Sequence, residues 1–256
     1  MLEYGQFCTV ARGAEIFGER WTPLVIRELM CGSTRFNDLR RGLPRMSATL
    51  LTQRLRSLEK LGVIKRAQSA HGPEYRLTPA GEDLKPIVLA LGHWGARWVG
   101  SRLKNHELDA GLLMWDIRRF AHRDLFPRQQ RTVIQFQFSD ARAGERCWWL
   151  VAKDGDIDLC RDDPGHEVTF IVDATVRGLT EIWSGDRTPE EVMRTREVRV
   201  LGSSHDARSL WRWIGVSAFA PTRREAIQNK PVTGAASRRE RPSPAAHRGP
   251  GADRHH

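Results

Sequence analysis

Leucine and other apolar residues recur at helical intervals through the first sixty residues. Their spacing predicts four short, closely connected helices over residues 7–17, 22–31, 35–41 and 47–61. Gly32 closes the second helix, and either Ser33 or Thr34 is expected to cap the third. Ser47 is expected to cap the fourth helix, because a short hydroxyl side chain accepts a hydrogen bond from a free amide at a helix start.

A hairpin and a longer helix follow. Gly62 ends the fourth helix, and residues 63–78 predict two strands joined by a loop over residues 69–73. From residue 84 the apolar positions return every three or four residues and predict a long amphipathic helix that carries Leu91, Trp94 and Trp98. Helix, turn, helix and hairpin are the elements of a winged helix-turn-helix, in which the second helix of the motif lies in the DNA major groove.

The helix over residues 47–61 has two chemically different faces. Leu51, Leu55 and Leu58 fall within about 60° of one another and form a core-facing stripe. The opposite face has no carboxylate and carries Thr49, Thr52, Gln53, Arg56 and Lys60. Solvated faces usually mix both signs of charge, so this face suits a polyanion. An ordinary solvated surface is the alternative that this helix alone leaves open.

The residue types on this face fit base readout. Gln53 can bond adenine bidentately, Arg56 can bond guanine O6 and N7, and the methyl groups of Thr49 and Thr52 can contact thymine. Further candidates are Ser47 and Ala48 near the groove floor, Lys60 at a phosphate, and Arg66, His71 and Arg76 in the hairpin. His71 is equally well explained as an ordinary turn residue.

From about residue 107 the pattern changes to strands that alternate with helices. In the run TVIQFQF, Ile134, Phe136 and Phe138 share one face. Asp154-Gly155 joins two strand-like runs as a tight hairpin turn. A helix near residues 113–120, strands over 167–174 and 197–202, and helices over 175–185, 188–195 and 209–215 complete an α+β domain.

Charge divides the chain into three parts. The net charge is +10, and residues 1–103 hold 16 Lys+Arg against 9 Asp+Glu, residues 104–220 hold 17 against 19, and residues 221–256 hold 8 against 3. A basic first part suggests contact with nucleic acid. The alternative is genome composition, because 35 of the 41 basic residues are Arg, and the nucleotide content of a genome alone can produce that bias. Beyond Pro221 aromatic residues disappear, so a disordered basic tail is expected there.

Several function classes are excluded by the sequence. No run approaches the roughly 18 apolar residues of a membrane span, and the N-terminus lacks the pattern of a secretory signal, so a cytoplasmic protein without membrane contact is expected.

Four separated cysteines form no C-x-x-C pair, which argues against a metal site or a disulfide framework. No catalytic constellation or phosphate loop is present, and the alternating carboxylates of DGDIDL are explained by the hairpin turn. We therefore expect no enzyme, cofactor or metal.

Residues 8 to about 100 resemble the HxlR-type winged helix-turn-helix regulators of bacteria. The resemblance rests on Trp21, the pair Arg35-Phe36, Leu39, LTQRLRSLEKLG at 51–62 and YRLTPAG at 75–81. It implies a homodimeric transcription factor in which the N-terminal segment and the helix around Leu91, Trp94 and Trp98 form the dimer. Alternatively, these tryptophans pack on the second domain. Arg35 joins the DNA-contact candidates.

Two further residues matter within this resemblance. Arg54 lies at the edge of the leucine side, so we assign it to an internal ion pair with Glu28 or Asp38 before assigning it to DNA. Cys8 matches a position where many such regulators carry a cysteine, and some of them sense oxidants there. Arg12, one turn along, could stabilise a thiolate. The alternative is that Cys8 is a small core residue.

The second domain resembles the sterol-carrier-protein-2-like fold, a sheet with helices enclosing an apolar cavity. The resemblance rests on the order of WWLVAKDGDIDLC, VDATVRGLTEIWSGDRTPEEVMRT and the closing EVRVLG and SLWRWIG. It implies an apolar ligand, with candidate pocket walls Ile134, Phe136, Trp148, Leu150 and Ile171. Each of these residues is alternatively an ordinary core residue.

Together these patterns predict a homodimeric regulator, most simply a repressor, that reads a pseudo-palindromic DNA operator and responds to an apolar effector. The predicted parts are a winged-helix domain with its dimerisation helix over residues 1–103, a ligand-binding domain over 104–220 and a tail over 221–256. The rival hypothesis is a lipid or sterol carrier whose N-terminal half serves mainly for oligomerisation. Salt-dependent DNA binding discriminates between the two.

Overall fold

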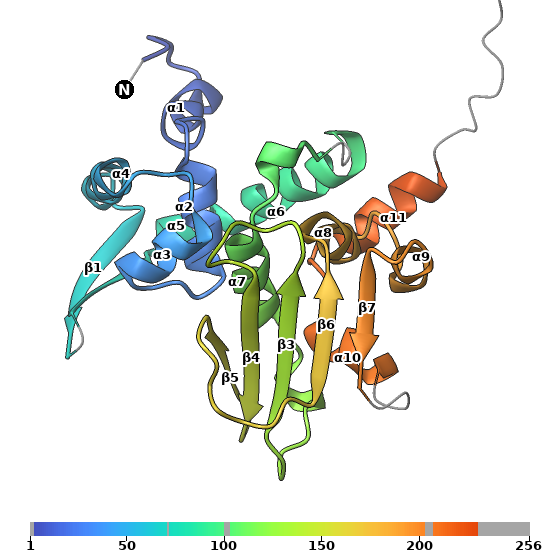
Figure 1. Ribbon diagram of the computed structural model, residues 1–256. Coiled ribbons are helices and arrows are strands. Elements are labelled where there is room, and N and C mark those ends of the chain that lie inside the picture. Colours follow the sequence, from blue (N-terminus) through green and yellow to red (C-terminus); the bar gives the residue numbers. More distant parts are fainter. Residues whose placement is uncertain (1–2, 71, 100–102, 203–206, 230–256) are drawn as a thin grey trace, which may run out of the picture.

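The chain folds into an N-terminal half of helices with a hairpin and a C-terminal half built on a sheet (Figure 1), and each half has its own hydrophobic core. The computed structural model describes residues 3–70, 72–99, 103–202 and 207–229. The smaller core belongs to the N-terminal half and includes Val25, Ile26, Leu39, Leu51 and Leu55. The larger core lies between the sheet and the helices of the C-terminal half. In the described part of the chain, no helix combines the length and apolar character needed to cross a membrane.

The N-terminal half has a winged helix-turn-helix-like fold, and the four predicted helices are confirmed. Its elements are α1 (Thr9–Phe17), α2 (Thr22–Met30), α3 (Phe36–Gly42), α4 (Ala48–Lys60), β1 (Ile64–Ser69), β2 (Gly72–Leu77), α5 (Pro79–Glu82), α6 (Lys85–Trp94) and a π-helical turn η1 (Gly95–Val99). The antiparallel β1–β2 hairpin is the wing. Ser69 pairs with Gly72, so the wing turn is tighter than the loop predicted over residues 69–73.

The structure confirms the predicted N-cap of α4 but not the predicted N-cap of α3. Ser47 caps α4 as predicted, since its Oγ accepts a hydrogen bond from the Leu50 amide at 3.2 Å. The predicted cap of α3 is wrong, because Arg35 occupies that position without a side-chain bond. The Ser33 hydroxyl instead donates a hydrogen bond to the buried Glu28 carboxylate at 3.2 Å. Thr34 accepts the Tyr75 amide at 2.7 Å through its carbonyl, which fastens the wing to α3.

The C-terminal half is a five-stranded sheet covered by helices on one face. Its elements are η2 (Asn105–Glu107), α7 (Ala110–Phe120), η3 (Arg123–Leu125), β3 (Thr132–Phe138), β4 (Cys147–Lys153), β5 (Asp156–Cys160), β6 (Phe170–Ala174), α8 (Val176–Ser184), α9 (Pro189–Arg194), β7 (Val198–Leu201) and α10 (Ala207–Ile214). The strand order is β5-β4-β3-β6-β7, and only β3 and β6 run parallel. Asp154 and Gly155 both have positive φ, which confirms the predicted hairpin turn between β4 and β5.

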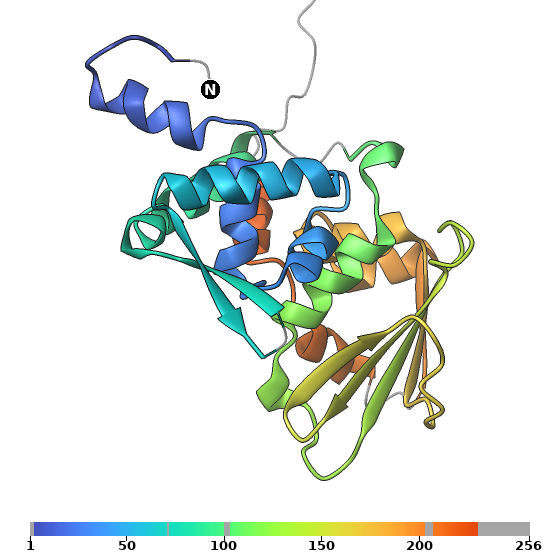
Figure 2. The ribbon, with the colours of Figure 1, turned by 90° about the vertical axis from the view of Figure 1, so that its left-hand side faces the viewer.

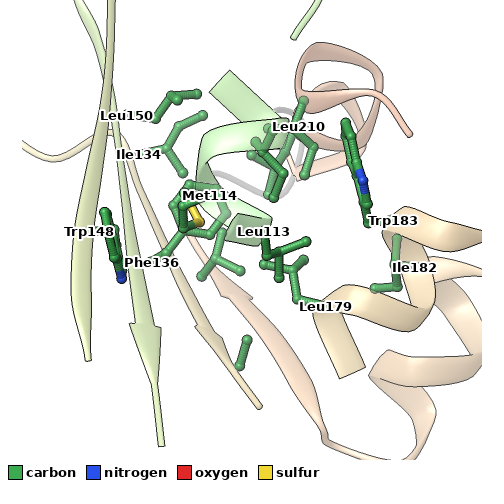
Figure 3. Packing of buried hydrophobic residues seen from close by; sticks show 14 of the residues in the cluster. Leu113, Met114, Ile134, Phe136, Trp148, Leu150, Leu179, Ile182, Trp183 and Leu210 are labelled. Atoms are coloured by element: carbon green, nitrogen blue, oxygen red, sulfur yellow. The ribbon is translucent and has the colours of Figure 1, made fainter. Parts of the chain in front are cut away.

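Helix α7 is shared by the two halves (Figure 2). Leu113 and Met114 point into the larger core, where they meet the sheet and α8 (Figure 3), and Ile117 belongs to the same core. Asp116 and Arg119 lie on the opposite side of α7 and contact α2 through ion pairs. The two groups are about half a turn apart on the helix, so α7 is buried on both sides.

The expectation of a tail from residue 221 is wrong for its first residues. A further helix, α11 (Ala220–Gln228), packs against α6 and η1. Thr222 is buried and its hydroxyl lies 2.7 Å from His93 Nδ1 of α6, while the Phe219 ring meets the His93 ring edge-on. Pro221 fits the first turn of a helix, where its missing N–H costs nothing. Residues 230–256 lie outside the described residues.

Candidate nucleic-acid interface

Helix α4 presents a polar face away from the core. Leu51, Leu55 and Leu58 are buried on its inner side. On its outer side Thr49, Gln53, Arg56 and Lys60 are exposed, and Thr52 is half-buried. Figure 2 shows α4 lying across the near side of the molecule, in front of α2. A duplex could therefore approach this face in the described part of the chain.

Two hydroxyl groups on α4 are partly engaged within the helix itself. The Thr52 hydroxyl donates to the Ala48 carbonyl at 2.9 Å, so only its lone pairs and its methyl group remain for a ligand. Ser47 Oγ accepts the Leu50 amide, so it can still donate. Ala48 is exposed beside them at the helix start. Among the described residues, Thr49, Gln53, Arg56 and Lys60 of this face make no side-chain hydrogen bond or ion pair.

Arg54 is a structural residue, as its place on the leucine side suggested, but its predicted partners are wrong. It is 8% exposed and pairs with Glu19, in the turn between α1 and α2. Glu28 is engaged by Arg119, and Asp38 pairs with Arg41 at 3.2 Å. Sequence spacing could not identify Glu19, because the contact depends on how the turn between α1 and α2 packs against α4.

The wing carries its cations on two different faces. Lys65 pairs across the hairpin with Arg76, whereas Arg66 pairs with Tyr75, so Arg66 and Arg76 point to opposite sides. The DNA contacts of Arg66 and Arg76 stay predictions, and the register adds Lys65 beside Arg76. Lys65 is exposed, was missed from the sequence, and is recognisable only once the register is known. His71 lies outside the described residues.

Arg76 and Arg35 both lie close to Glu74 of the wing. The Arg76 guanidinium donates to the Glu74 carboxylate at 2.8 Å, and this bond holds the pKa of Glu74 below its usual range. Arg35 is exposed at the start of α3 and forms an isolated β-bridge with Glu74. Glu74 therefore neutralises part of the positive charge that the sequence predicts to contact DNA.

Large apolar side chains are exposed on α6 and η1 and also at the start of α1, and we call this set the apolar surface. Leu91, Trp94 and Trp98 are 48%, 57% and 70% exposed, and Phe7 and Val10 are 100% and 77% exposed. The alternative in which the two tryptophans pack on the second domain is thus wrong for the described chain. Such a concentration of exposed large apolar side chains is typical of an association surface.

Cys8 lies beside this apolar surface. It occupies the N-cap position of α1, is exposed, and makes no side-chain capping bond. The interpretation of Cys8 as a small core residue is therefore wrong in the single chain, because its neighbours Phe7 and Val10 are exposed as well. Its use as a redox switch stays a prediction.

The predicted pocket walls do not surround one cavity. Ile134, Phe136 and Leu150 are 0% exposed and pack in the larger core (Figure 3). Ile171 pairs with Gln135, so strand alternation places it on the other face of the sheet. Trp148 lines a cavity at the edge of the sheet. The apolar interior is filled by side chains of the protein itself.

Comparison with known proteins identifies relatives of part of the chain. Residues 16–102 match the model of the HxlR-like helix-turn-helix family. YvaP of Bacillus subtilis, an uncharacterised HTH-type transcriptional regulator, is 35% identical over 91 residues, which are 34% of this chain and 84% of YvaP. The regulator MT3179 of Mycobacterium tuberculosis, also uncharacterised, is 42% identical over 96 residues, but the chain spans only 59% of its length.

A solved structure matches over a similar share. The redox regulator HypR in its reduced form is 33% identical, with a TM-score of 0.32, and the match covers 34% of this chain and 90% of HypR. The family match ends at residue 102, before α7, so the resemblance of the C-terminal half to sterol-carrier proteins stays a prediction. On the family match and the identity to YvaP, the chain belongs to the HxlR-like helix-turn-helix family.

Proposed function

We propose that this protein is a sequence-specific DNA-binding transcriptional regulator that acts as a homodimer. The observation that carries the proposal is the exposed outer face of α4, where Thr49, Gln53, Arg56 and Lys60 stand opposite the buried leucines. The HTH-type transcriptional regulators among its relatives support the same function.

Base readout is assigned to two side chains. Gln53 suits adenine and Arg56 suits guanine, and each such bidentate contact discriminates against a wrong base by about 1–3 kcal/mol. Arg35, Lys60, Arg66 and Arg76 are assigned to phosphates, together with Lys65, and Ser47, Ala48, Thr49 and Thr52 to close approach at the groove. These contacts position the protein and make its affinity depend on salt.

Dimerisation is assigned to the apolar surface on α1, α6 and η1. Burying Leu91, Trp94 and Trp98 against a second copy removes large aromatic area from water. Two-fold symmetry would then present two copies of α4 to half-sites roughly 34 Å apart, one turn of the duplex. A dimer spread over that length excludes other proteins from the duplex, so we propose repression as its effect.

The C-terminal half is proposed to control DNA affinity through an effector. It is joined to the helix-turn-helix by α7, which contacts α2 and the sheet. An effector that prefers one arrangement of these elements would change operator affinity by its differential binding to the two states.

The test is selection of binding sites from a random duplex library, followed by anisotropy titration of the selected duplex. A dimer with about 6 to 10 phosphate contacts should lose roughly 10³- to 10⁵-fold in affinity between about 50 and 200 mM salt. Gln53→Ala should weaken the selected duplex more than a scrambled one, whereas Gln129→Ala, in an exposed loop of the C-terminal half, should leave both unchanged. Salt-independent binding, or no enrichment of any site, would refute the proposal.

A further inference from the structure

A cavity of ≈ 420 Å³ lies where the winged-helix half meets the C-terminal half. Arg41 at the end of α3 and Pro44 in the following turn form one wall, and α7 and the β4–β5 edge form the rest. We call it the interdomain cavity. Its size falls within the roughly 300–1,000 Å³ of small-molecule sites.

Two tryptophans with stacked arginines line this cavity. The guanidinium carbons of Arg41 and Arg118 lie 5.3 and 5.2 Å from the centre of the Trp115 ring, and that of Arg161 lies 5.3 Å from the Trp148 ring. Trp115 and Trp148 are 6% and 7% exposed, so their rings are fixed by the surrounding protein. A guanidinium stacked on a ring keeps its N–H edge available for a carboxylate. Arg41 uses part of this edge on Asp38 at 3.2 Å and Arg161 uses part of it on the Gly144 carbonyl, so each retains further N–H groups for a ligand.

Three carboxylates also line the cavity and offset the positive charge of its arginines. Asp109 accepts the Leu112 amide at 2.8 Å and is held as the cap of α7. Asp158 lies 4.0 Å from Arg118 and its side chain is 78% exposed, so this ion pair is at the limit of contact. Glu145 completes the lining. An incoming anion can therefore replace Asp158 as the partner of Arg118 at little cost.

We infer that the interdomain cavity binds a planar aromatic carboxylate and that its occupant alters DNA affinity. The ring matches the flat guanidinium groups that cover the two tryptophans, and the carboxylate matches the N–H edges of those groups. An apolar ligand without charge would cover the guanidinium groups of Arg41, Arg118 and Arg161 from water without offering an acceptor to their remaining N–H groups. The inference rests on the proposed function for its regulatory part alone, since binding of the ligand needs no DNA.

The position of the cavity explains how a bound ligand would change the DNA affinity of α4. Arg41 and Pro44 belong to the segment that leads into α4, in which Leu43 and Met46 are buried and Ser47 caps the helix. A ligand that contacts this segment acts on the residues that set the direction of α4. Effector coupling of the usual strength would change operator affinity roughly 5- to 150-fold.

The test is calorimetric titration of the full chain, without DNA, with 2-naphthoate as the probe. Two analogues separate its features: 2-naphthylmethanol has the ring without the charge, and cyclohexanecarboxylate has the charge without the ring. We expect one naphthoate per chain and at least tenfold weaker binding of both analogues. Equal binding of 2-naphthylmethanol would overturn the charge assignment, and no naphthoate binding at millimolar concentration would overturn the site.

Matched variants locate the binding. Leu112→Trp fills the cavity and Arg118→Gln removes a guanidinium, and both should weaken naphthoate at least tenfold. Leu125→Trp and Arg123→Gln make the same changes in η3, which does not line the cavity, and should bind like the parent. Circular dichroism establishes that each variant is folded. Equal binding in all four variants would place the ligand elsewhere.

Operator titration separates this inference from the proposed function. Operator binding without naphthoate tests the proposed function alone. If naphthoate binds in the cavity but operator affinity stays constant, the site stands and its regulatory role is refuted.

Discussion

Arg119 of α7 forms a bidentate ion pair with Glu28 of α2, with Nη1 2.6 Å from Oε2 and Nη2 3.2 Å from Oε1. Their side chains are 6% and 0% exposed. Arg27 bonds Asp116 at 2.8 Å and Glu28 at 2.9 Å, and Asp116 also pairs with Arg119, which gives two cations and two anions in one network. Burial disfavours the charged guanidinium, but Glu28 and Asp116 outweigh it and raise the pKa of Arg119.

Breaking this network should destabilise the whole protein. Glu28→Gln leaves two guanidinium groups with one carboxylate, and we expect a loss of about 3 kcal/mol in the free energy of unfolding. Arg119→Met should cost a similar amount, and the double variant less than the sum, because neither charge is then left unpaired. Urea unfolding provides the measurement. Additive losses would show that the two residues are not coupled.

Arg54 and Arg56 should respond in opposite ways to the same change. Arg54→Met removes the partner of Glu19 beneath α4 and should lower stability by about 2–3 kcal/mol while the folded protein still recognises its operator. Arg56→Met, on the exposed face, should leave stability within about 0.5 kcal/mol and weaken specific binding. Thermal melting and anisotropy titration measure the two properties. A reversed pattern would contradict the assigned roles.

The proposed dimer should depend on the apolar surface of α6 and η1. Trp94→Glu places a charge at its centre and should yield monomers by light scattering after gel filtration. Leu201→Glu, which changes an exposed apolar residue of β7, serves as the control and should leave the mass unchanged. A parent protein that is already monomeric at micromolar concentration would rule out this surface as a stable interface.

The thiols of Cys8 and Cys31 should differ in reactivity. Burial raises the pKa of the Cys31 thiol above its ordinary value of 9.0, more than Arg119 and Arg27 lower it. Cys8 is exposed. Iodoacetamide should therefore modify Cys8 before Cys31, as followed by peptide mass spectrometry at pH 7.5. If Cys8 is a redox switch, Cys8→Ser should abolish oxidant-induced release of DNA, and unchanged release would exclude that role.

Acid should weaken the C-terminal half through Glu197. The Thr195 hydroxyl and the Arg187 guanidinium hold the pKa of Glu197 below its ordinary value of 4.5. A carboxyl with a depressed folded pKa contributes stability that is present above pH 4.5 and is lost as the pH falls through the folded pKa. Glu197→Gln should thus flatten the stability profile below pH 4.5, whereas Glu190→Gln, at an exposed position of α9, should not.

The helices and strands could be predicted because their signals are local. The leucine spacing of α4, the Ser47 cap and the Asp154-Gly155 turn each depend on residues only a few positions apart. The exposed face of α4 follows from the same periodicity, and for this reason the candidate DNA contacts on it could be named in advance.

The errors concern contacts between distant segments. The partner of Arg54 and the attachment of α11 to His93 depend on packing that no local pattern encodes. Ile171 was grouped with the pocket walls because apolar character alone does not say which face of a sheet a residue occupies. The interdomain cavity was missed because it combines α3, α7 and the sheet edge.

The shared position of α7 bears on how such a protein can be divided. A fragment ending at residue 103 would keep the winged helix but expose an α2 surface shaped for a permanent neighbour, with Glu28 stripped of Arg119. Such a fragment is not equivalent to a short free-standing regulator of similar length. For the same reason, transplanting the C-terminal half onto another regulator requires an acid at the place of Glu28 and a glycine at the place of Gly42, where a Cβ atom would collide with that carboxylate.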